Sequence, residues 1–368
     1  MPDQPVAPTS TAGAFAAARA TVVPVDDAAA ADARHLSDRL TKPRGALGRV
    51  EALGAQLAAI AGVCPPPVPQ PAAVAVFAAD HGVVAEGVTP WPSEVTAQMV
   101  ANLVSGGAAI NVLARQFGAP VLVVDVGVAT ALPDGLASAG LVEARVRNGT
   151  GNIAVEPAMT SGQAEMALDV GAATAARLIA DGARCLVTGE MGIGNTTASA
   201  AIVASVCRRP PSEVTGRGTG IDDGMLARKV AVVEQALARL PPGADADALG
   251  LLAAIGGLEI AALAGFIVGG AAARVPVIAD GLIAGAAALV ADRLVPAVRG
   301  YLIAGHRSSE PGASAALAAL GLEPVLELEL RLGEGTGACL AVPVVQASAH
   351  ILAEMATFDS AGVTDKDL

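Results

Sequence analysis

A single acidic residue lies between two glycines near the C-terminal end of the chain, in the segment LRLGEGTGA (Leu330–Ala338). Gly333 and Gly335 flank Glu334 at the point where an alternating apolar pattern gives way to a long helical pattern. A turn with a purely structural role would more naturally use Asn or Asp there. Glu334 is therefore a candidate functional acid.

Six further polar residues lie at or next to the ends of short apolar runs that lead into a glycine. They are Asp80, His81, Asp125, Glu190, Asp280 and His306. If the runs are parallel strands, these side chains meet at one edge of a sheet, where α/β proteins bind their ligands. Each could be an ordinary capping or turn residue on its own, but their shared placement favours a site.

Glycine-rich loops follow several of these runs. In GEMGIGNTTASAA (Gly189–Ala201) two glycines allow a sharp turn before a helix whose free N–H groups could hold a phosphate. The segment matches neither the Walker loop nor the GxGxxG fingerprint, and by pattern alone it could equally be a plain tight turn. A second loop, TGRGTGIDDGMLARKV (Thr215–Val230), adds Arg217 and Lys229. Two such loops and a lysine could together hold a phosphate monoester.

Two more glycine-rich loops, RNGTGNIAVEPAMT (Arg147–Thr160) and GHRSSEPG (Gly305–Gly312), occur in comparable places. A structural protein has little use for so many exposed loops at strand ends. The sequence therefore predicts a ligand pocket.

The apolar runs that must position these residues alternate with Ala-rich helical segments. They are AVAVFAADHG (Ala73–Gly82), PVLVVDVG (Pro120–Gly127), RCLVTGEMGIG (Arg184–Gly194), VPVIADG (Val275–Gly281) and YLIAGH (Tyr301–His306). Continuous apolar strands that alternate with helices predict an α/β fold, in which a parallel, Rossmann-like sheet is covered by helices on both faces.

The segments outside these runs suggest a smaller second unit. Helices are expected around Asp26–Leu40 and within Thr41–Ile60, and the run CPPPVPQP (Cys64–Pro71) is a connector. The last segment alternates through Val325 to Leu332 and then turns helical up to Phe358. Helices from both chain ends would then form a small domain.

We accordingly predict four regions. They are a flexible tail at 1–20, the N-terminal helices of the small domain at 21–66, the large α/β domain at 67–320, and the C-terminal part of the small domain at 321–368.

Composition narrows the class of protein. The 368 residues are 53% hydrophobic and 16% charged, with only 2% aromatic residues, so the core must pack mainly small aliphatic side chains. The formal charge of −12 argues against nucleic-acid binding but leaves room for a small anionic ligand. No secretory signal is visible, and the longest uncharged piece of the apolar region 251–291 is too short to span a bilayer.

The four cysteines, Cys64, Cys185, Cys207 and Cys339, show neither metal-ligand spacing nor a disulfide pattern. We therefore expect a reduced, cytoplasmic protein without a membrane span, a metal or a cofactor.

Nine segments in this order make the chain resemble the nicotinate-nucleotide–dimethylbenzimidazole phosphoribosyltransferase family, from about Thr41 to about Val363. They are TKPRGALGRVE, FAADHGVVAEGVTPWPSEVTAQMV, SGGAAINVLAR, RNGTGNIA, GEMGIGNTTASAA, GRGTGIDD, IADG, AGHRSSEPG and RLGEGTGA. Any one of them is a weak signal, whereas nine in order are a specific one. The resemblance implies the same two-part fold and a homodimer.

The resemblance also implies an activity, the transfer of phosphoribose from nicotinate mononucleotide to 5,6-dimethylbenzimidazole. The products are α-ribazole 5′-phosphate and nicotinate, and the first serves lower-ligand synthesis for cobalamin. By match to the GEGTG segment, Glu334 would be the general base that removes the acceptor's N–H proton. We expect burial to raise its pKa and the start of the following helix to hold it ionised, so that the carboxylate stays charged near neutral pH.

Other roles carry over by position in the motifs. Glu190 and Gly192 match the ribose-phosphate side, Gly218 and Lys229 match positions near the phosphate, and Gln98 matches a position that lines the benzimidazole pocket. The resemblance gives His81 and His306 no chemical role, and a structural role is expected for each.

Three alternatives stay open at this point. The same donor could serve a purine or phenolic acceptor, with Trp91 in GVTPWPSEV (Gly87–Val95) narrowing the slot. The protein could be a non-catalytic nucleotide-binding or scaffold module. It could also be a nucleotide N-glycosidase that uses water, although no second acid stands out to orient that water.

Overall fold

The computed structural model describes residues 11–218, 220–241, 243–244 and 247–364, and its centre is a seven-stranded sheet. The strand order is β3-β2-β1-β4-β5-β6-β7, and every pairing is parallel. The strands are β1 (Ala72–Ala79), β2 (Val121–Gly127), β3 (Val142–Glu143), β4 (Cys185–Met191), β5 (Val277–Ala279), β6 (Leu302–His306) and β7 (Pro324–Leu326). All five predicted runs are therefore strands, and the parallel α/β fold is confirmed.

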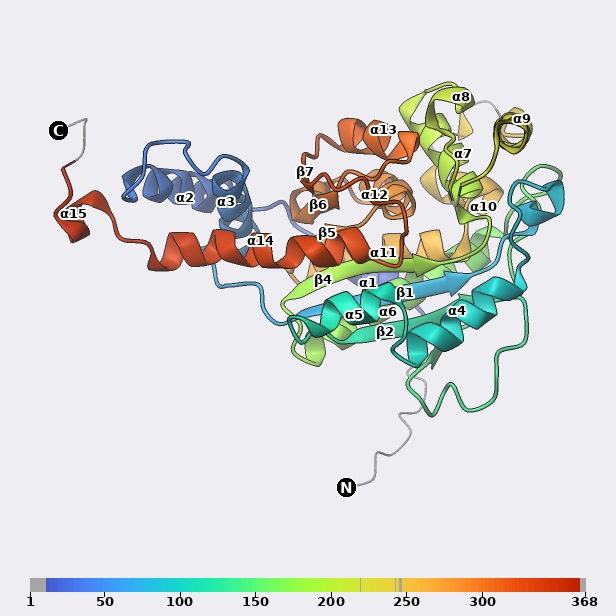
Figure 1. Ribbon diagram of the computed structural model, residues 1–368, viewed down its shortest axis with the longest axis horizontal. Coiled ribbons are helices and arrows are strands. Elements are labelled where there is room, and N and C mark those ends of the chain that lie inside the picture. The colour runs from blue at the N-terminus through green and yellow to red at the C-terminus, as the bar shows by residue number, and fades with distance from the viewer. Residues whose placement is uncertain (1–10, 219, 242, 245–246, 365–368) are drawn as a thin grey trace.

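The central strands are apolar along their whole length because helices cover both faces. All eight residues of β1 are buried. On one face lie α4 (Glu94–Val104), α5 (Ala109–Arg115) and the first part of α14 (Thr336–Glu354), which stand in front of the strands in Figure 1. On the other face α11 (Leu258–Ala272) contacts β1, β2, β4 and β5, and α12 (Leu282–Leu294) contacts β4 and β5.

A second layer covers α11. Helix α6 (Ser161–Ala180) packs along it, and α1 (Ala14–Thr21) contacts both α6 and α11. The α6–α11 contact is close because glycines face backbone: a Cβ at Gly171 would lie 1.8 Å from the Ala262 carbonyl oxygen, and one at Gly265 would lie 2.0 Å from the Leu168 carbonyl oxygen. Small residues therefore set the distance between these two helices.

The remaining helical segments connect and flank these layers. They are α2 (Asp27–Arg39), α3 (Arg49–Ala61), η1 (Gly82–Glu86), α7 (Asn195–Cys207), α8 (Pro211–Val214), α9 (Asp223–Ala238), α10 (Ala248–Ile255), η3 (Pro296–Tyr301), α13 (Pro311–Leu320) and α15 (Phe358–Ala361). The Cys64–Pro71 connector has neither helix nor strand, as predicted.

Helices from both ends of the chain pack together, as the sequence indicated. Helices α2, α3 and the C-terminal half of α14 bury a separate apolar cluster at one end of the molecule (Figure 1). An antiparallel bridge between Leu40 and Thr357 joins the two ends. Helix α3 begins only at Arg49 because the segment before it contains Lys42-Pro43 and two left-handed glycines, Gly45 and Gly48.

Two segments differ from the predicted division. Part of the predicted tail is helical: α1 is held at its start by Asp169, whose carboxylate accepts N–H groups from Gly13 and Phe15. Residues 1–10 lie outside the described residues. Strand β7 falls beyond the boundary predicted at residue 321, yet it pairs with β6 in the large sheet. Only Pro324 and Leu326 of β7 are paired with β6. The alternating apolar pattern runs on to Leu332, but residues 327–332 form no strand.

Two helical segments have the length and composition of a membrane span, Glu94–Arg115 and α14. The first is divided by the turn 105–108 into α4 and α5, which pack on the sheet. The most apolar window of α14 is 56% buried, against α3 and the strands β4, β5, β6 and β7. Both segments therefore pack as covering helices of the α/β domain.

The chain topology opens a crevice at one edge of the sheet. From β1 the chain moves outward to β2 and β3, and it then returns to the other side of β1 as β4. Loops that follow β1 and β4 thus diverge at their carboxyl ends, which is where open α/β sheets bind ligands. The polar strand ends predicted from the sequence lie at this edge.

The α6–α11 contact can be tested with two alanines on one helix. Gly171→Ala should destabilise the fold by about 1–3 kcal/mol, because its methyl group meets backbone that cannot move without separating the helices. Gly162→Ala, also on α6, has open space around the added methyl group and should cost nothing. Thermal unfolding of both variants checks this; equal melting temperatures would contradict close backbone packing.

Candidate active site

A pocket of about 380 Å³ lies at the carboxyl edge of the sheet, beside the point where the strand order reverses. It is lined from the segments that follow β1, β4, β5 and β6 and from the segment before α14. The segment that follows β1 supplies apolar lining from Val88, Trp91, Val95 and Met99, and further apolar side chains come from other segments, among them Met191, Leu282 and Leu332.

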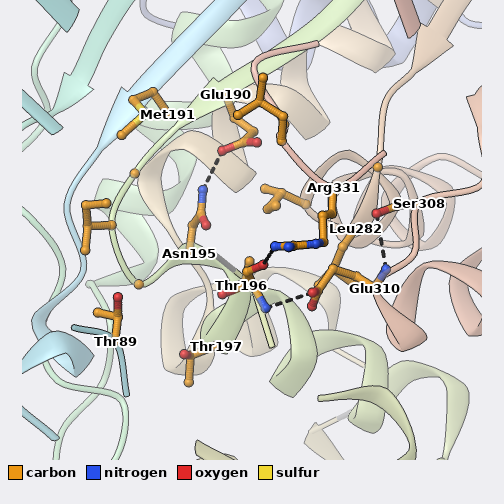
Figure 2. A pocket seen from close by; sticks show the side chains of 18 of the residues that line it. Thr89, Glu190, Met191, Asn195, Thr196, Thr197, Leu282, Ser308, Glu310 and Arg331 are labelled. Atoms are coloured by element: carbon orange, nitrogen blue, oxygen red, sulfur yellow. Dashed lines mark hydrogen bonds between the residues drawn. The ribbon is translucent and has the colours of Figure 1, made fainter. Parts of the chain in front are cut away.

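The turn after β4 brings Glu190 to the pocket. Gly192 is required because a Cβ there would lie 2.2 Å from the Ala79 carbonyl oxygen, and Gly194 has φ 95° at the start of α7. Asn195 donates its Nδ2–H to Glu190 Oε2 at 2.5 Å, a contact visible in Figure 2. Burial raises the pKa of Glu190 to about 8, and the negative charges of Asp280 and Glu259 add to the shift. Burial therefore favours the protonated form of Glu190.

Lys229 reaches the pocket from α9 and is 2% exposed. Its Nζ donates to Thr196 Oγ1 at 2.8 Å, in the first turn of α7, and to the Gly216 carbonyl at 3.2 Å. Burial lowers the pKa of Lys229 to about 8, although the nearby Glu310 carboxylate opposes the shift. A bound anion would favour the charged form of this lysine.

The loop that contains Gly218 is held from both sides. The Gly218 N–H donates to Glu310 Oε1 at 2.8 Å, and Arg331 Nη1 donates to the Gly218 carbonyl at 2.6 Å. Gly218 itself has φ 52°, a left-handed conformation that favours glycine. Figure 2 shows Ser308, Glu310 and Arg331 grouped away from the Glu190–Asn195 pair. With Arg217 and Lys229 also in the lining, this end can hold a phosphate.

Glu334 lies in the tightest turn of the site. Gly333, Glu334 and Gly335 have φ values of 84°, 62° and 93°, three successive left-handed residues. The turn packs directly on β4, because a Cβ at Gly189 would lie 2.5 Å from the Glu334 carbonyl oxygen and one at Gly335 would lie 2.7 Å from the Thr188 carbonyl oxygen. The flanking glycines are therefore required by sterics, as the sequence suggested.

The Glu334 carboxylate is 5% exposed and lines the pocket. Burial raises its pKa, the Ile110 N–H at 3.4 Å from Oε2 acts in the opposite direction, and the Asp280 charge raises the pKa further. Burial therefore outweighs the opposing hydrogen bond in setting the direction of the pKa shift, and the charged state of Glu334 near neutral pH stays a prediction. The N–H group comes from α5, on a different element from the helix that follows Glu334 in the sequence.

The structure brings five of the six predicted site residues together, namely Glu190, Gly192, Gly218, Lys229 and Glu334. The prediction for Gln98 does not agree with this structure, where the side chain is exposed and outside the pocket lining. Val95 and Met99, four residues apart, form the pocket face of α4, and Gln98 lies one residue before Met99, about 100° around the helix.

His81 and His306, the two histidines for which a structural role is predicted, have different surroundings. His81 Nε2 lies 2.7 Å from Glu259 Oε1, and both side chains are fully buried outside the pocket lining. Burial alone would lower the pKa of His81, but the charge and hydrogen bond of Glu259, together with the Asp80 charge, outweigh it and raise the pKa. His306 lines the pocket, with Nε2 3.4 Å from Asp280 Oδ1.

Sequence reasoning assigned no role to several residues that the pocket contains. Asn195, Ser308 and Glu310 belong to glycine-rich segments that the sequence did single out, so their loops were found without their individual contacts. Arg331 had no signal of its own. Its role depends on the approach of two loops that are more than 100 residues apart in the chain.

Comparison with known proteins agrees with this geometry. A family model described as "Phosphoribosyltransferase" matches residues 22–363. The nicotinate-nucleotide–dimethylbenzimidazole phosphoribosyltransferase of Salinispora tropica is 55% identical over 358 residues, which cover 94% of this chain and 98% of that protein. The protein of the same name from Chloroflexus aurantiacus is 56% identical over 343 residues, which cover 93% and 96%.

Among solved structures, CobT from Thermus thermophilus superposes with a TM-score of 0.87 at 50% identity and covers 92% of this chain and 99% of that one. Identity at this level over nearly the whole length of each relative, together with the shared fold, establishes common ancestry. The chain therefore belongs to the nicotinate-nucleotide–dimethylbenzimidazole phosphoribosyltransferase family.

Proposed function

We propose that this enzyme transfers phosphoribose from nicotinate mononucleotide to 5,6-dimethylbenzimidazole and so supplies α-ribazole 5′-phosphate for cobalamin synthesis. The names of the relatives, which specify nicotinate nucleotide and dimethylbenzimidazole, support the two substrates. One observation of the site supports the reaction most directly: a buried carboxylate, Glu334, shares a pocket with apolar side chains and with a separate, cation-containing end.

The donor fits the polar end. A phosphate monoester would lie at the start of α7, near Lys229, Arg217 and Arg331, and would gain charge-assisted hydrogen bonds there. The Glu190–Asn195 pair lies next to the turn of Glu334, since a Cβ at Gly333 would lie 2.2 Å from Glu190 Oε1. The pyridinium ring of the donor already carries a positive charge. Its nitrogen becomes neutral when the bond to C1′ breaks, so nicotinate can leave without being protonated.

The acceptor fits the apolar side. A flat benzimidazole would lie among Trp91, Met99 and Met191, with its ring N–H directed at Glu334. One ring nitrogen forms the new bond to C1′ as the bond from C1′ to the pyridinium nitrogen breaks. The acceptor ring becomes cationic, and the proton on its other nitrogen passes to the Glu334 carboxylate. Attack opposite the leaving group inverts C1′ from β to α.

The raised pKa of Glu334 suits this role. A base is most effective when its pKa approaches the working pH, and burial moves Glu334 in that direction. The Ile110 N–H limits the shift and favours the carboxylate form that accepts a proton.

A homodimer and a cytoplasmic location, both expected from the sequence, remain proposals. The homodimer follows from the family resemblance, and the location from four cysteines that form no disulfide in the described residues.

The acceptor can be identified directly. Incubation with nicotinate mononucleotide and a panel of benzimidazoles, purines and phenols, followed by mass spectrometry, should give α-ribotide of dimethylbenzimidazole as the preferred product. If a purine or phenol gave the preferred product, that base would be the acceptor in place of dimethylbenzimidazole. Ribose 5-phosphate without an acceptor would indicate a glycosidase, and donor binding with no product from any base would indicate a binding module.

The role of Glu334 is tested by Glu334→Gln. We expect a loss of roughly 10²–10⁴-fold in kcat, because the amide cannot take the acceptor proton, while donor binding measured by calorimetry stays unchanged. Glu329→Gln is a matched control, since Glu329 lies in the same segment, is exposed and also has a positive φ. Full activity in Glu334→Gln would refute the assignment.

The close approach of the catalytic turn to β4 predicts a second effect. Gly189→Ala should push the Glu334 carbonyl away from the strand and lower kcat by roughly 10–100-fold, since small misplacements of a reacting group are costly. Donor affinity should change much less, because Lys229 and the Gly218 loop belong to other elements. Gly162→Ala serves as the control; an unaltered kcat in Gly189→Ala would show that the turn can relax.

A further inference from the structure

Asp280, directly after β5, makes contacts that the proposed reaction has not used. It is 6% exposed and lines the pocket. Its backbone N–H donates to Thr188 Oγ1 on β4 at 3.0 Å, and its Oδ1 accepts the Ala338 N–H at 2.9 Å. Ala338 is in the first turn of α14, so one aspartate connects two strands with the start of the helix that follows Glu334.

His306 supports the same contact from β6. Its Nε2 lies 3.4 Å from the Oδ1 that accepts the Ala338 N–H, and the ring is 3% exposed. The first turn of α14 lies against this ring, because a Cβ at Gly337 would come within 2.0 Å of it. His306 Nδ1 has no hydrogen-bond partner in the described part of the chain. Asp280 and His306 thus hold the beginning of α14 against the sheet.

That helix start and the catalytic turn form one piece. The Thr336 N–H and Oγ1 both donate to the Gly333 carbonyl, at 3.0 and 2.9 Å, and the Cys339 N–H donates to the Gly335 carbonyl at 2.9 Å. Any movement of the first turn of α14 therefore moves the segment that contains Glu334.

We propose that Asp280 is a positioning residue for Glu334: with His306 it fixes the first turn of α14, and through it the turn that carries the catalytic carboxylate. The inference rests on the proposed function. Asp280 acts through Glu334 and takes no proton from the substrates.

Several charged or titratable groups besides Asp280 share the pocket with Glu334. They are Glu190 on β4, Lys229 on α9, His306 on β6, Glu310 before α13, and Arg217 and Arg331 on loops. Among them all, Asp280 is the group whose charge raises the pKa of Glu334, and it also raises that of Glu190. A like charge disfavours the ionised form, so removal of the Asp280 charge should lower the pKa of Glu334.

The test is the pH profile of kcat for Asp280→Asn at saturating nicotinate mononucleotide and dimethylbenzimidazole. The amide oxygen can still accept the Ala338 N–H, but the charge is gone. A base is active above its pKa, so the acid limb should move to lower pH by roughly one unit relative to wild type. We also expect kcat to fall by roughly 10-fold on the plateau, because the contact with His306 is weakened.

Asp125→Asn is the matched control. Asp125 is also a buried aspartate at a strand end that accepts a backbone N–H, from Val128, but it lies outside the pocket lining. The Asp125→Asn variant should be less stable, because it loses the ion pair to Arg145. The acid limb of its pH profile should coincide with that of the wild type. An acid limb in Asp280→Asn that coincides with wild type would overturn the proposal, as would equal shifts in both variants.

His306→Gln separates the effect of the Asp280 charge from the effect of holding α14 in place. It can also be measured if Asp280→Asn does not fold. It keeps the Asp280 charge but removes the ring beneath α14, so kcat should fall by roughly 10-fold with the acid limb unmoved. An unchanged kcat would overturn the positioning role. Absence of transfer by the wild-type enzyme with every acceptor would instead refute the proposed function, which keeps the two failures distinct.

Discussion

The Gly333–Gly335 turn packs directly on strand β4, and the position of the Glu334 carboxylate in the pocket depends on this contact. Three successive left-handed residues are needed to make the turn, and a left-handed Glu334 costs about 1–2 kcal/mol. The cost is tolerated because the surrounding contacts leave no alternative: the carbonyl of Glu334 occupies the space where residue 189 would otherwise carry a Cβ. Strain at a functional acid thus has a specific structural cause.

Charge is distributed unevenly across the pocket. Lys229 and Arg331 donate to the carbonyls of the Gly216–Gly218 segment, where the Glu310 carboxylate also accepts the Gly218 N–H, and Glu190, Asp280 and Glu334 line the same pocket. Burial raises the pKa of Glu190 and of Glu334, and the Asp280 charge adds to both shifts. A donor with an anionic phosphate and a cationic ring would offer each sign of charge an opposite partner.

Much of the fold follows from local patterns in the sequence. Continuous apolar runs identify the strands, because only a sheet covered on both faces buries every residue of a strand. The polar strand ends and glycine loops then place the site at the carboxyl edge, and Glu190, Lys229 and Glu334 meet there as expected. These predictions need only the order of strands and loops along the chain. Parallel strands place their carboxyl ends at the same edge of the sheet, whatever the exact length of each strand.

What the patterns missed depends on contacts between elements. The sequence could not show which face of α4 meets the pocket, so it placed Gln98 there in place of Val95 and Met99. The sequence suggested that the start of the next helix would counter the effect of burial on the pKa of Glu334. In the structure the Ile110 N–H, from α5, lowers that pKa. The contact of Asp280 with α14 likewise joins residues far apart in the chain.

Close backbone packing connects the core to the site. Gly171 and Gly265 bring α6 and α11 into backbone contact, and Gly189 and Gly305 allow a similarly close approach between the strands and the segment around the start of α14. Backbone in contact with backbone leaves little room to relax, unlike an interface of flexible side chains. Charged and polar groups held on such elements need no reorganisation when the transition state forms, which is the condition for electrostatic stabilisation to be effective. A chain with 42 glycines and 2% aromatic residues is suited to that kind of rigidity, because small residues let its elements approach closely enough to fix one another.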